Sequence, residues 1–356
     1  MTPSGTTLAV KESASTFHMP GNSGDRTGET MMHPQARHHA ARRLAKEVVI
    51  VGTGRVGTTA AFASMLSGIA ESITLVDHDG DRATGEALDM LHGLPFVPHP
   101  MVRAGGFDSC RSADVVVVAP GVSGKPAESR LDLVRRSVEV MREIVPRIAE
   151  QTRDAVLIVL SSSVDVLTRA AVRLSGLPAK HVIGMGTMLD TSRLRTLLAD
   201  HFGLDPHEVH AYVLGEHGEG EVITWSLTRV GGMSLDEFAR TSSIKWNDAI
   251  RERIGMQVRE AGAQVVRRKG ALHFATGLAA SSLLRAILRD EQSVQTVSTV
   301  LEQIPMFADV AMSLPCVIGK SGCRSAVPLI LEDCEQEALE RSAESLRRTY
   351  EMAGGP

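Results

Sequence analysis

A glycine-rich turn between a strand and a helix constrains the fold of this chain more than any other feature. Residues 47–51 read Glu-Val-Val-Ile-Val and predict a buried parallel strand, and a helical pattern runs from Arg55 to Ile69. The first glycine of such a turn permits a sharp bend, the second lets the backbone approach a pyrophosphate, and the third allows close helix packing. The helix N-terminus adds free N–H groups for a phosphate. We therefore predict a dinucleotide site at Gly52, Gly54, Arg55, Val56 and Gly57.

An aspartate at the end of the next predicted strand suggests which dinucleotide binds. Asp77 closes the segment 72–77 and follows Gly57 by twenty residues. A carboxylate at this place can accept hydrogen bonds from both ribose hydroxyls, and it would repel a 2′-phosphate. The alternative is an aspartate that caps a helix or faces solvent. The sequence favours NAD over NADP as the cofactor.

Strands and helices then alternate up to about residue 185. We expect strands at 113–118, 154–160 and 181–184, and helices at 79–92 and 131–151. This alternation predicts an α/β fold, a Rossmann-type doubly wound parallel sheet over residues 46–185 that binds the cofactor.

The pattern changes in residues 186–356, where we expect a mixed α+β domain that binds substrate and carries the catalytic residues. Its expected helices cover 189–201, 245–289 and a charged segment from Glu335. Its expected strands cover 208–214, 221–229, 294–300 and 306–318.

Composition excludes several classes of partner and site. The net charge of −4 argues against nucleic acid, and no apolar run reaches the length of a membrane span. The four cysteines are scattered, which is typical of reduced thiols in a cytoplasmic protein. Residues 1–45 are polar and lack hydrophobic periodicity, so we expect a disordered tail; its histidines do not form a convincing metal site. No metal is expected.

Four separated motifs carry a family resemblance. They are Leu214-Gly-Glu-His-Gly218, Leu189-Asp-Thr-Ser-Arg193, Glu128-Ser-Arg-Leu131 and Leu314-Pro-Cys-Val-Ile-Gly319. In this order they closely resemble the L-lactate/malate dehydrogenase family, and in particular its bacterial lactate dehydrogenase branch, from about Lys46 to Tyr350. The resemblance implies an NAD-dependent enzyme that interconverts a small L-2-hydroxy acid and its 2-oxo acid, as a homotetramer or a homodimer.

The resemblance also assigns roles that suit this chemistry. Reduction of a 2-oxo acid needs a proton donor, and His217 is the candidate because histidine titrates near neutral pH. Asp190 would bond the far side of its ring, Arg193 would hold the substrate carboxylate through two parallel bonds, and Arg130 would polarise the carbonyl. Taken singly, the histidine could be structural, the aspartate a helix cap, and the arginines solvated surface residues.

Residues 121–129 match the mobile active-site loop of the family. Small residues suit a lid that closes over substrate and delivers Arg130. The alternative is an ordinary surface connection. The resemblance places Gly121 and Ser162 at the cofactor.

Three substrate-pocket positions depart from the family pattern. Gly124 stands where lactate enzymes carry Gln and malate enzymes carry Arg, which argues against malate. Ser162 replaces an asparagine that normally reaches substrate and cofactor, and Leu272 replaces a common threonine. We infer a roomier, less polar pocket and a bulkier apolar substrate, such as a branched-chain or aryl 2-oxo acid. The alternatives are an ordinary L-lactate dehydrogenase, or an NAD-binding member with weak or lost catalysis.

A last match concerns regulation. Arg195 and His210 fall where bacterial lactate dehydrogenases bind fructose 1,6-bisphosphate between subunits. Two basic groups could pair with a phosphate, although both also have simple structural roles.

Overall fold

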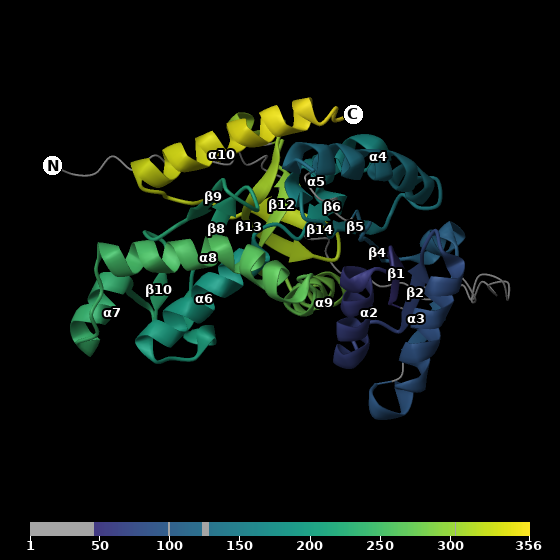
Figure 1. Cartoon of the computed structure of the whole chain (residues 1–356), viewed down its shortest axis with the longest axis horizontal. Helices are drawn as coiled ribbons and strands as arrows, with labels where there is room; N and C mark the ends of the chain where they lie inside the picture. The colour runs from purple at the N-terminus through teal and green to yellow at the C-terminus, as the bar shows by residue number, and fades with distance from the viewer. Residues whose placement is uncertain (1–45, 99, 123–127, 303) are drawn as a thin grey trace, which may run out of the picture.

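The computed structural model describes residues 46–98, 100–122, 128–302 and 304–356 (Figure 1). The expected disordered tail, residues 1–45, lies outside the described residues, as does Gly124. Within the described part of the chain, none of the helices combines the length and apolar character needed to cross a bilayer.

The first half of the chain forms six parallel strands in the order β3-β2-β1-β4-β5-β6. Their bounds are β1 Glu47–Val51, β2 Ser72–Val76, β3 Met101–Ala104, β4 Val115–Val118, β5 Val156–Val159 and β6 Val182–Gly184. The order reverses between β1 and β4. In such sheets the cofactor binds beyond the carboxyl ends of the strands at this point. The predicted Rossmann-type sheet is confirmed.

Four helices connect these strands. They are α2 Arg55–Ser67, α3 Gly80–His92, α4 Arg130–Ala149 and α5 Val164–Ser175. Helices α4 and α5 pack against each other, and α2 packs against α9 (Figure 1). Helix α2 ends two residues before the predicted Ile69 because Gly68, at φ 59°, caps it in the left-handed conformation.

Most strands of the second half extend the same sheet. Strand β12 (Ser293–Val300) lies antiparallel to β6, and β13 (Ala311–Gly319), β8 (Val213–Gly215) and β9 (Glu221–Ile223) follow; β14 (Gly322–Ala326) pairs with β13. A small separate sheet joins β11 (Met233–Ser234), β10 (Arg229–Val230) and β7 (Val209–His210).

Five helices surround these strands: α6 Met188–Phe202, α7 Leu235–Ser242, α8 Asp248–Lys269, α9 Phe274–Leu288 and α10 Asp333–Met352. The helical region expected over 245–289 is divided at Gly270, which has φ +82° and ends α8. The turn that follows, residues 270–273, carries Leu272.

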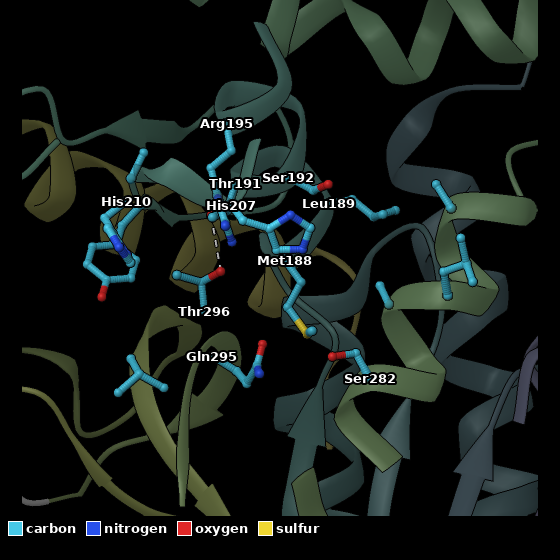
Figure 2. A pocket seen from close by; sticks show the side chains of 16 residues that line it. Met188, Leu189, Thr191, Ser192, Arg195, His207, His210, Ser282, Gln295 and Thr296 are labelled. Carbon is cyan, nitrogen blue, oxygen red and sulfur yellow. Dashed lines mark hydrogen bonds between the residues drawn. The ribbon is translucent and has the colours of Figure 1, made fainter. Parts of the chain in front are cut away.

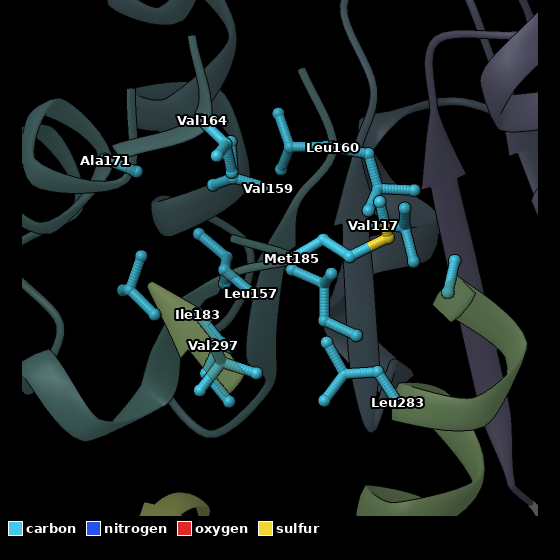
Figure 3. Close-up of a cluster of buried hydrophobic side chains, with 14 of the residues drawn as sticks. Val117, Leu157, Val159, Leu160, Val164, Ala171, Ile183, Met185, Leu283 and Val297 are labelled. Atoms are coloured by element: carbon cyan, nitrogen blue, oxygen red, sulfur yellow. The ribbon is translucent and has the colours of Figure 1, made fainter. Parts of the chain in front are cut away.

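Aliphatic packing unites the two halves. Figure 3 shows Val117, Leu157 and Ile183 of the parallel strands beside Val297 of β12 and Leu283 of α9. All five are fully buried. Burial of this kind contributes about 25 cal/mol for each Å² of apolar surface, so the core fixes how the two halves meet.

Several elements differ from the sequence prediction. Helices α5 and α7 and strands β3 and β14 were not predicted, and the strand expected over 208–214 is broken into β7 and β8. Strand β13 begins at Ala311 rather than Met306 because Pro305, which lacks an N–H donor, starts a 3₁₀ turn there. Short edge strands such as β3 carry little hydrophobic period and are hard to detect.

Candidate active site

The glycine-rich turn has the backbone that its sequence requires. Gly52 adopts φ +103°, and a Cβ there would lie 2.2 Å from the Ala119 carbonyl oxygen. A Cβ on Gly57 would lie 1.9 Å from the Gly52 carbonyl oxygen. A Cβ on Gly54 would meet nothing within 4 Å, so open space lies above this glycine. Gly54 is the N-cap of α2, so no side chain caps the helix N-terminus, which begins with Arg55 and Val56. The turn therefore fits the pyrophosphate of a dinucleotide.

Asp77 stands directly after β2 and faces this turn. Its Oδ2 accepts hydrogen bonds from the backbone N–H of Thr53 at 2.6 Å and from the Thr53 hydroxyl at 2.9 Å. Burial alone would raise the pKa of Asp77, but the bonds from Thr53 and Asp79 outweigh burial and lower it. The helix cap is a different residue, since Asp79 accepts from the Arg82 N–H. Asp77 is therefore an ionised carboxylate beside the turn.

Asp190 joins the two side chains expected to handle proton and substrate. It lies in the first turn of α6 and is 2 % exposed. Its Oδ2 lies 2.6 Å from Nδ1 of His217, and its Oδ1 accepts from Nη1 of Arg193 at 2.5 Å. One buried carboxylate thus bridges the imidazole and the guanidinium, and it contacts the ring through Nδ1 rather than Nε2.

The electrostatics of this group favour a protonated histidine. Burial disfavours the charged imidazole, but the hydrogen bond and charge of Asp190, together with the charge of Asp165, raise the pKa of His217. Its side chain is 25 % exposed, so the ring is accessible. A raised pKa keeps a proton donor available to higher pH.

Asp165 and Glu221 also belong to this site, and the sequence analysis missed both. Oδ2 of Asp165 accepts from the backbone N–H of His217 at 2.8 Å, and burial raises the pKa of Asp165 to about 6. Glu221 lies on β9; burial, with repulsion from Asp190, raises its pKa to about 8. Its Oε1 has no hydrogen-bond partner among the described residues. Asp165 lies three residues after Ser162, which the sequence analysis singled out, whereas Glu221 had no sequence signal.

Arg130 begins α4 and its guanidinium reaches the turn that carries His217. Nη2 lies 2.8 Å from Oε1 of Glu216, the residue before His217. Glu216 was also missed as a site residue, although it stands inside the quoted Gly-Glu-His-Gly motif. Arg130 is therefore close to the turn that carries His217, at the base of the expected loop.

The described positions that depart from the family pattern, and Gly121 of the loop, make few contacts that identify a role. Ser162 is exposed after β5, and Leu272 is partly buried against the core in the turn between α8 and α9. Gly121 is exposed, and a Cβ there would meet nothing within 4 Å. Gly124 of the expected loop lies outside the described residues.

Arg195 and His210 line one cavity of about 530 Å³ (Figure 2). Arg195 lies on α6 and donates from Nη2 to the Pro206 carbonyl at 3.0 Å, whereas His210 is exposed on β7. His207 lines the same cavity, as do Leu278 and Ala279 of α9. Among the described residues, no group of three or more His, Cys, Asp or Glu side chains could hold a metal ion.

Comparison with known proteins places the chain in a family. Residues 46–184 match the NAD binding domain of lactate/malate dehydrogenase, and residues 187–353 match its alpha/beta C-terminal domain. The chain belongs to the lactate/malate dehydrogenase family. The family's NAD-dependent dehydrogenase chemistry follows, so the protein is an NAD-dependent 2-hydroxy-acid dehydrogenase.

Individual relatives agree with this assignment. An L-lactate dehydrogenase of Clostridium botulinum (strain Loch Maree / Type A3) is 38% identical over 314 residues, 88% of this chain and 99% of its own. L-lactate dehydrogenase 1 of Clostridium acetobutylicum is 38% identical over 305 residues, 86% of this chain and 97% of its own. The minor L-lactate dehydrogenase of Enterococcus mundtii superposes with a TM-score of 0.83 at 34% identity, covering 86% of this chain and 98% of that one.

Proposed function

We propose that this family member interconverts an L-2-hydroxy acid and its 2-oxo acid with His217 as the proton donor and acceptor. The observation that carries the proposal is the bridge from Asp190 to His217 at 2.6 Å and to Arg193 at 2.5 Å. The carboxylate fixes the ring tautomer and stabilises the imidazolium. Nε2 is then the atom that gives its proton to the carbonyl oxygen during reduction and takes it back during oxidation.

The two arginines complete the proposed site. Arg193 holds the substrate carboxylate, because its planar fork can make two parallel bonds. A Cβ on Gly262 of α8 would come within 3.4 Å of Nη2 of Arg193, so this small residue leaves room beside the clamp. Arg130 polarises the reacting carbonyl and stabilises the charge that develops on its oxygen.

The cofactor would be held by the glycine-rich turn and its surroundings. NAD supplies the hydride acceptor or donor of the reaction. Gly52, Gly54 and Gly57 shape the turn, and Arg55 and Val56 present the helix N-terminus to the pyrophosphate. Asp77 would accept from the adenosine ribose, with Gly121 and Ser162 nearer the nicotinamide.

For the substrate, we propose a side chain bulkier and less polar than that of pyruvate. Ser162 is shorter than the family's asparagine, and Leu272 adds apolar surface where threonine is common. The named relatives are L-lactate dehydrogenases, so pyruvate is the competing substrate. Gly124 supplies no second cation where malate enzymes carry an arginine, which disfavours a dicarboxylate substrate.

A panel of substrates tests two claims: that the protein reduces 2-oxo acids, and that it prefers a bulky apolar one. NADH oxidation is measured with pyruvate, oxaloacetate, 2-oxoisocaproate and phenylpyruvate, for the wild type and for Leu272→Thr. We expect a higher kcat/KM for the branched or aryl acids, and a shift toward pyruvate in the variant. A clear wild-type preference for pyruvate or oxaloacetate contradicts the bulky substrate. No turnover of any 2-oxo acid, with NADH binding intact, supports a binding protein that has lost catalysis.

We also propose an anionic effector, of the fructose 1,6-bisphosphate type, in the cavity of Figure 2. Arg195 and His210 line it, and the Arg195 Nε is buried without a hydrogen-bond partner among the described residues. Adding the bisphosphate should lower KM for the 2-oxo acid in the wild type, and not in Arg195→Gln. An unchanged substrate dependence counts against the site.

The oligomer proposal concerns helix α9, whose Leu278 and Ala279 line the same cavity. Phe274 and Leu278 of α9 are 66 % and 68 % exposed. We propose that another copy covers this face in a cytoplasmic homodimer or homotetramer, because these two side chains are neighbours four residues apart on one helix and contiguous exposed apolar surface marks an interface. Light scattering at micromolar concentration measures the mass, and a monomer would contradict the proposal.

A further inference from the structure

The backbone of Arg130 is firmly placed, but the direction of its side chain is not fixed by the helix. Arg130 is the first residue of α4, and the Ser129 hydroxyl caps the helix by accepting from the Asp132 N–H at 3.1 Å. Arg136 donates two bonds of 2.7 Å to Glu128, which ties the segment before Arg130 to the helix. The Arg130 side chain is 52 % exposed. Its orientation must therefore come from a contact outside α4.

Glu216 is a well-anchored partner for that contact. Its backbone N–H donates to the Ser342 hydroxyl at 2.8 Å, and the Ser345 hydroxyl lies 3.5 Å from Oε2. Both serines belong to α10. The Glu216 side chain is only 10 % exposed. The carboxylate therefore has a fixed place, immediately before His217 in the chain.

The ion pair with Glu216 uses only one nitrogen of the Arg130 guanidinium at close range. Nη2 of Arg130 meets Oε1 of Glu216 at 2.8 Å in a single-point contact. A Cβ on Gly218 would lie 2.6 Å from the same Nη2, so the group rests on the turn that carries His217. Glu219 is 4.0 Å from Nη1 and 95 % exposed, so its attraction is screened. Since arginine has five N–H donors, others remain for a substrate oxygen.

We infer that Glu216 is a positioning residue for Arg130. Its carboxylate orients the guanidinium across the His217 turn, so that a second N–H donates to the reacting carbonyl. In the same way, the Asp190 carboxylate orients His217 and Arg193. Each of the three cationic side chains of the site therefore contacts a buried carboxylate. The inference rests on the proposed role of Arg130 in carbonyl polarisation.

A double-mutant cycle tests this inference in the full-length enzyme. Steady-state kinetics with NADH and the preferred 2-oxo acid are compared for wild type, Glu216→Gln, Arg130→Gln and the double variant. Because the oxyanion contact strengthens in the transition state, E216Q should lower kcat about three- to fivefold with little change in KM. In the R130Q background, E216Q should cause no further loss. Glu219→Gln, the matched control, should keep the wild-type kcat.

The outcomes separate this inference from the proposed function. An equal loss from E216Q in both backgrounds means a merely structural role and overturns the inference, as does an unchanged kcat. A wild-type kcat in R130Q overturns the proposed role of Arg130 itself. Thermal unfolding checks that the variants fold. Glu216→Asp keeps the charge on a shorter side chain and should give an intermediate loss; it replaces E216Q if that variant is unstable.

Discussion

The glycine-rich turn and the catalytic cluster are built in contrasting ways. Gly52, Gly54 and Gly57 lie within one strand–turn–helix unit, and their contribution is backbone shape and open space. Asp190 and His217 come from α6 and from the turn after β8, and they act through side chains that meet across the fold. The first region is therefore sensitive to added atoms, and the second to lost charges and hydrogen bonds.

The largest expected effect comes from removing the proposed proton donor. His217→Gln should lower kcat for 2-oxo acid reduction by roughly 10²- to 10⁴-fold, the usual contribution of general acid catalysis. The dissociation constant for NADH should stay near the wild-type value, because the turn does not depend on this side chain. Stopped-flow fluorescence gives both quantities. His92→Gln, an exposed site near the end of α3, is the control, and a large loss of NADH affinity in H217Q would break the separation of the two regions.

Removing the shared carboxylate should change the pH dependence. In the wild type we expect the reduction to be lost as pH rises through the raised pKa of His217, because the proposed donor then loses its proton. Asp190→Asn removes the main contribution that raises this pKa, while burial still lowers it, so the alkaline limb of kcat/KM should move to lower pH. Rates measured from pH 5 to 9 with a saturating concentration of NADH report this limb. An unmoved limb would mean that another group sets it.

A single methyl group should disturb the turn. Gly57→Ala places a Cβ 1.9 Å from the Gly52 carbonyl oxygen, so the backbone must shift. Such overpacking costs about 1–3 kcal/mol, and we expect a Tm lowered by several degrees together with weaker NADH binding. Gly85→Ala in α3 is the matched control, since its Cβ would meet nothing within 4 Å, and it should be neutral or slightly stabilising. Equal behaviour of the two variants would contradict the close-packing role of Gly57.

The smallest expected effect concerns Glu221. Its pKa in the folded protein is raised to about 8, above its ordinary value of 4.5. Between these values the folded state holds a proton that the unfolded state has lost, so this group makes stability fall as pH rises. In Glu221→Gln that contribution is absent, and Tm relative to the wild type should increase from pH 5 to pH 8. A constant difference in Tm across this range would show that Glu221 ionises normally.

The sequence alone predicted the features that depend on neighbouring residues with a strong pattern. The glycine-rich turn, Asp77 directly after β2 and the parallel sheet follow from hydrophobic period and glycine placement, because a strand–turn–helix unit constrains its own backbone. The residues of the catalytic cluster were named through a family resemblance, since nothing local distinguishes His217 from a buried structural histidine. Short elements such as β3 and β14 were missed because their few residues carry little period.

Only the tertiary structure decided the contacts between segments that are distant in the sequence. The second half adds β12, β13, β8 and β9 to the first sheet, which brings α6 and the His217 turn together. The roles of Glu216 and Glu221 depend on that packing, because burial and a neighbouring charge are properties of a place in the fold. The glycine turn was determined by its own sequence, whereas the charged site was assembled by packing.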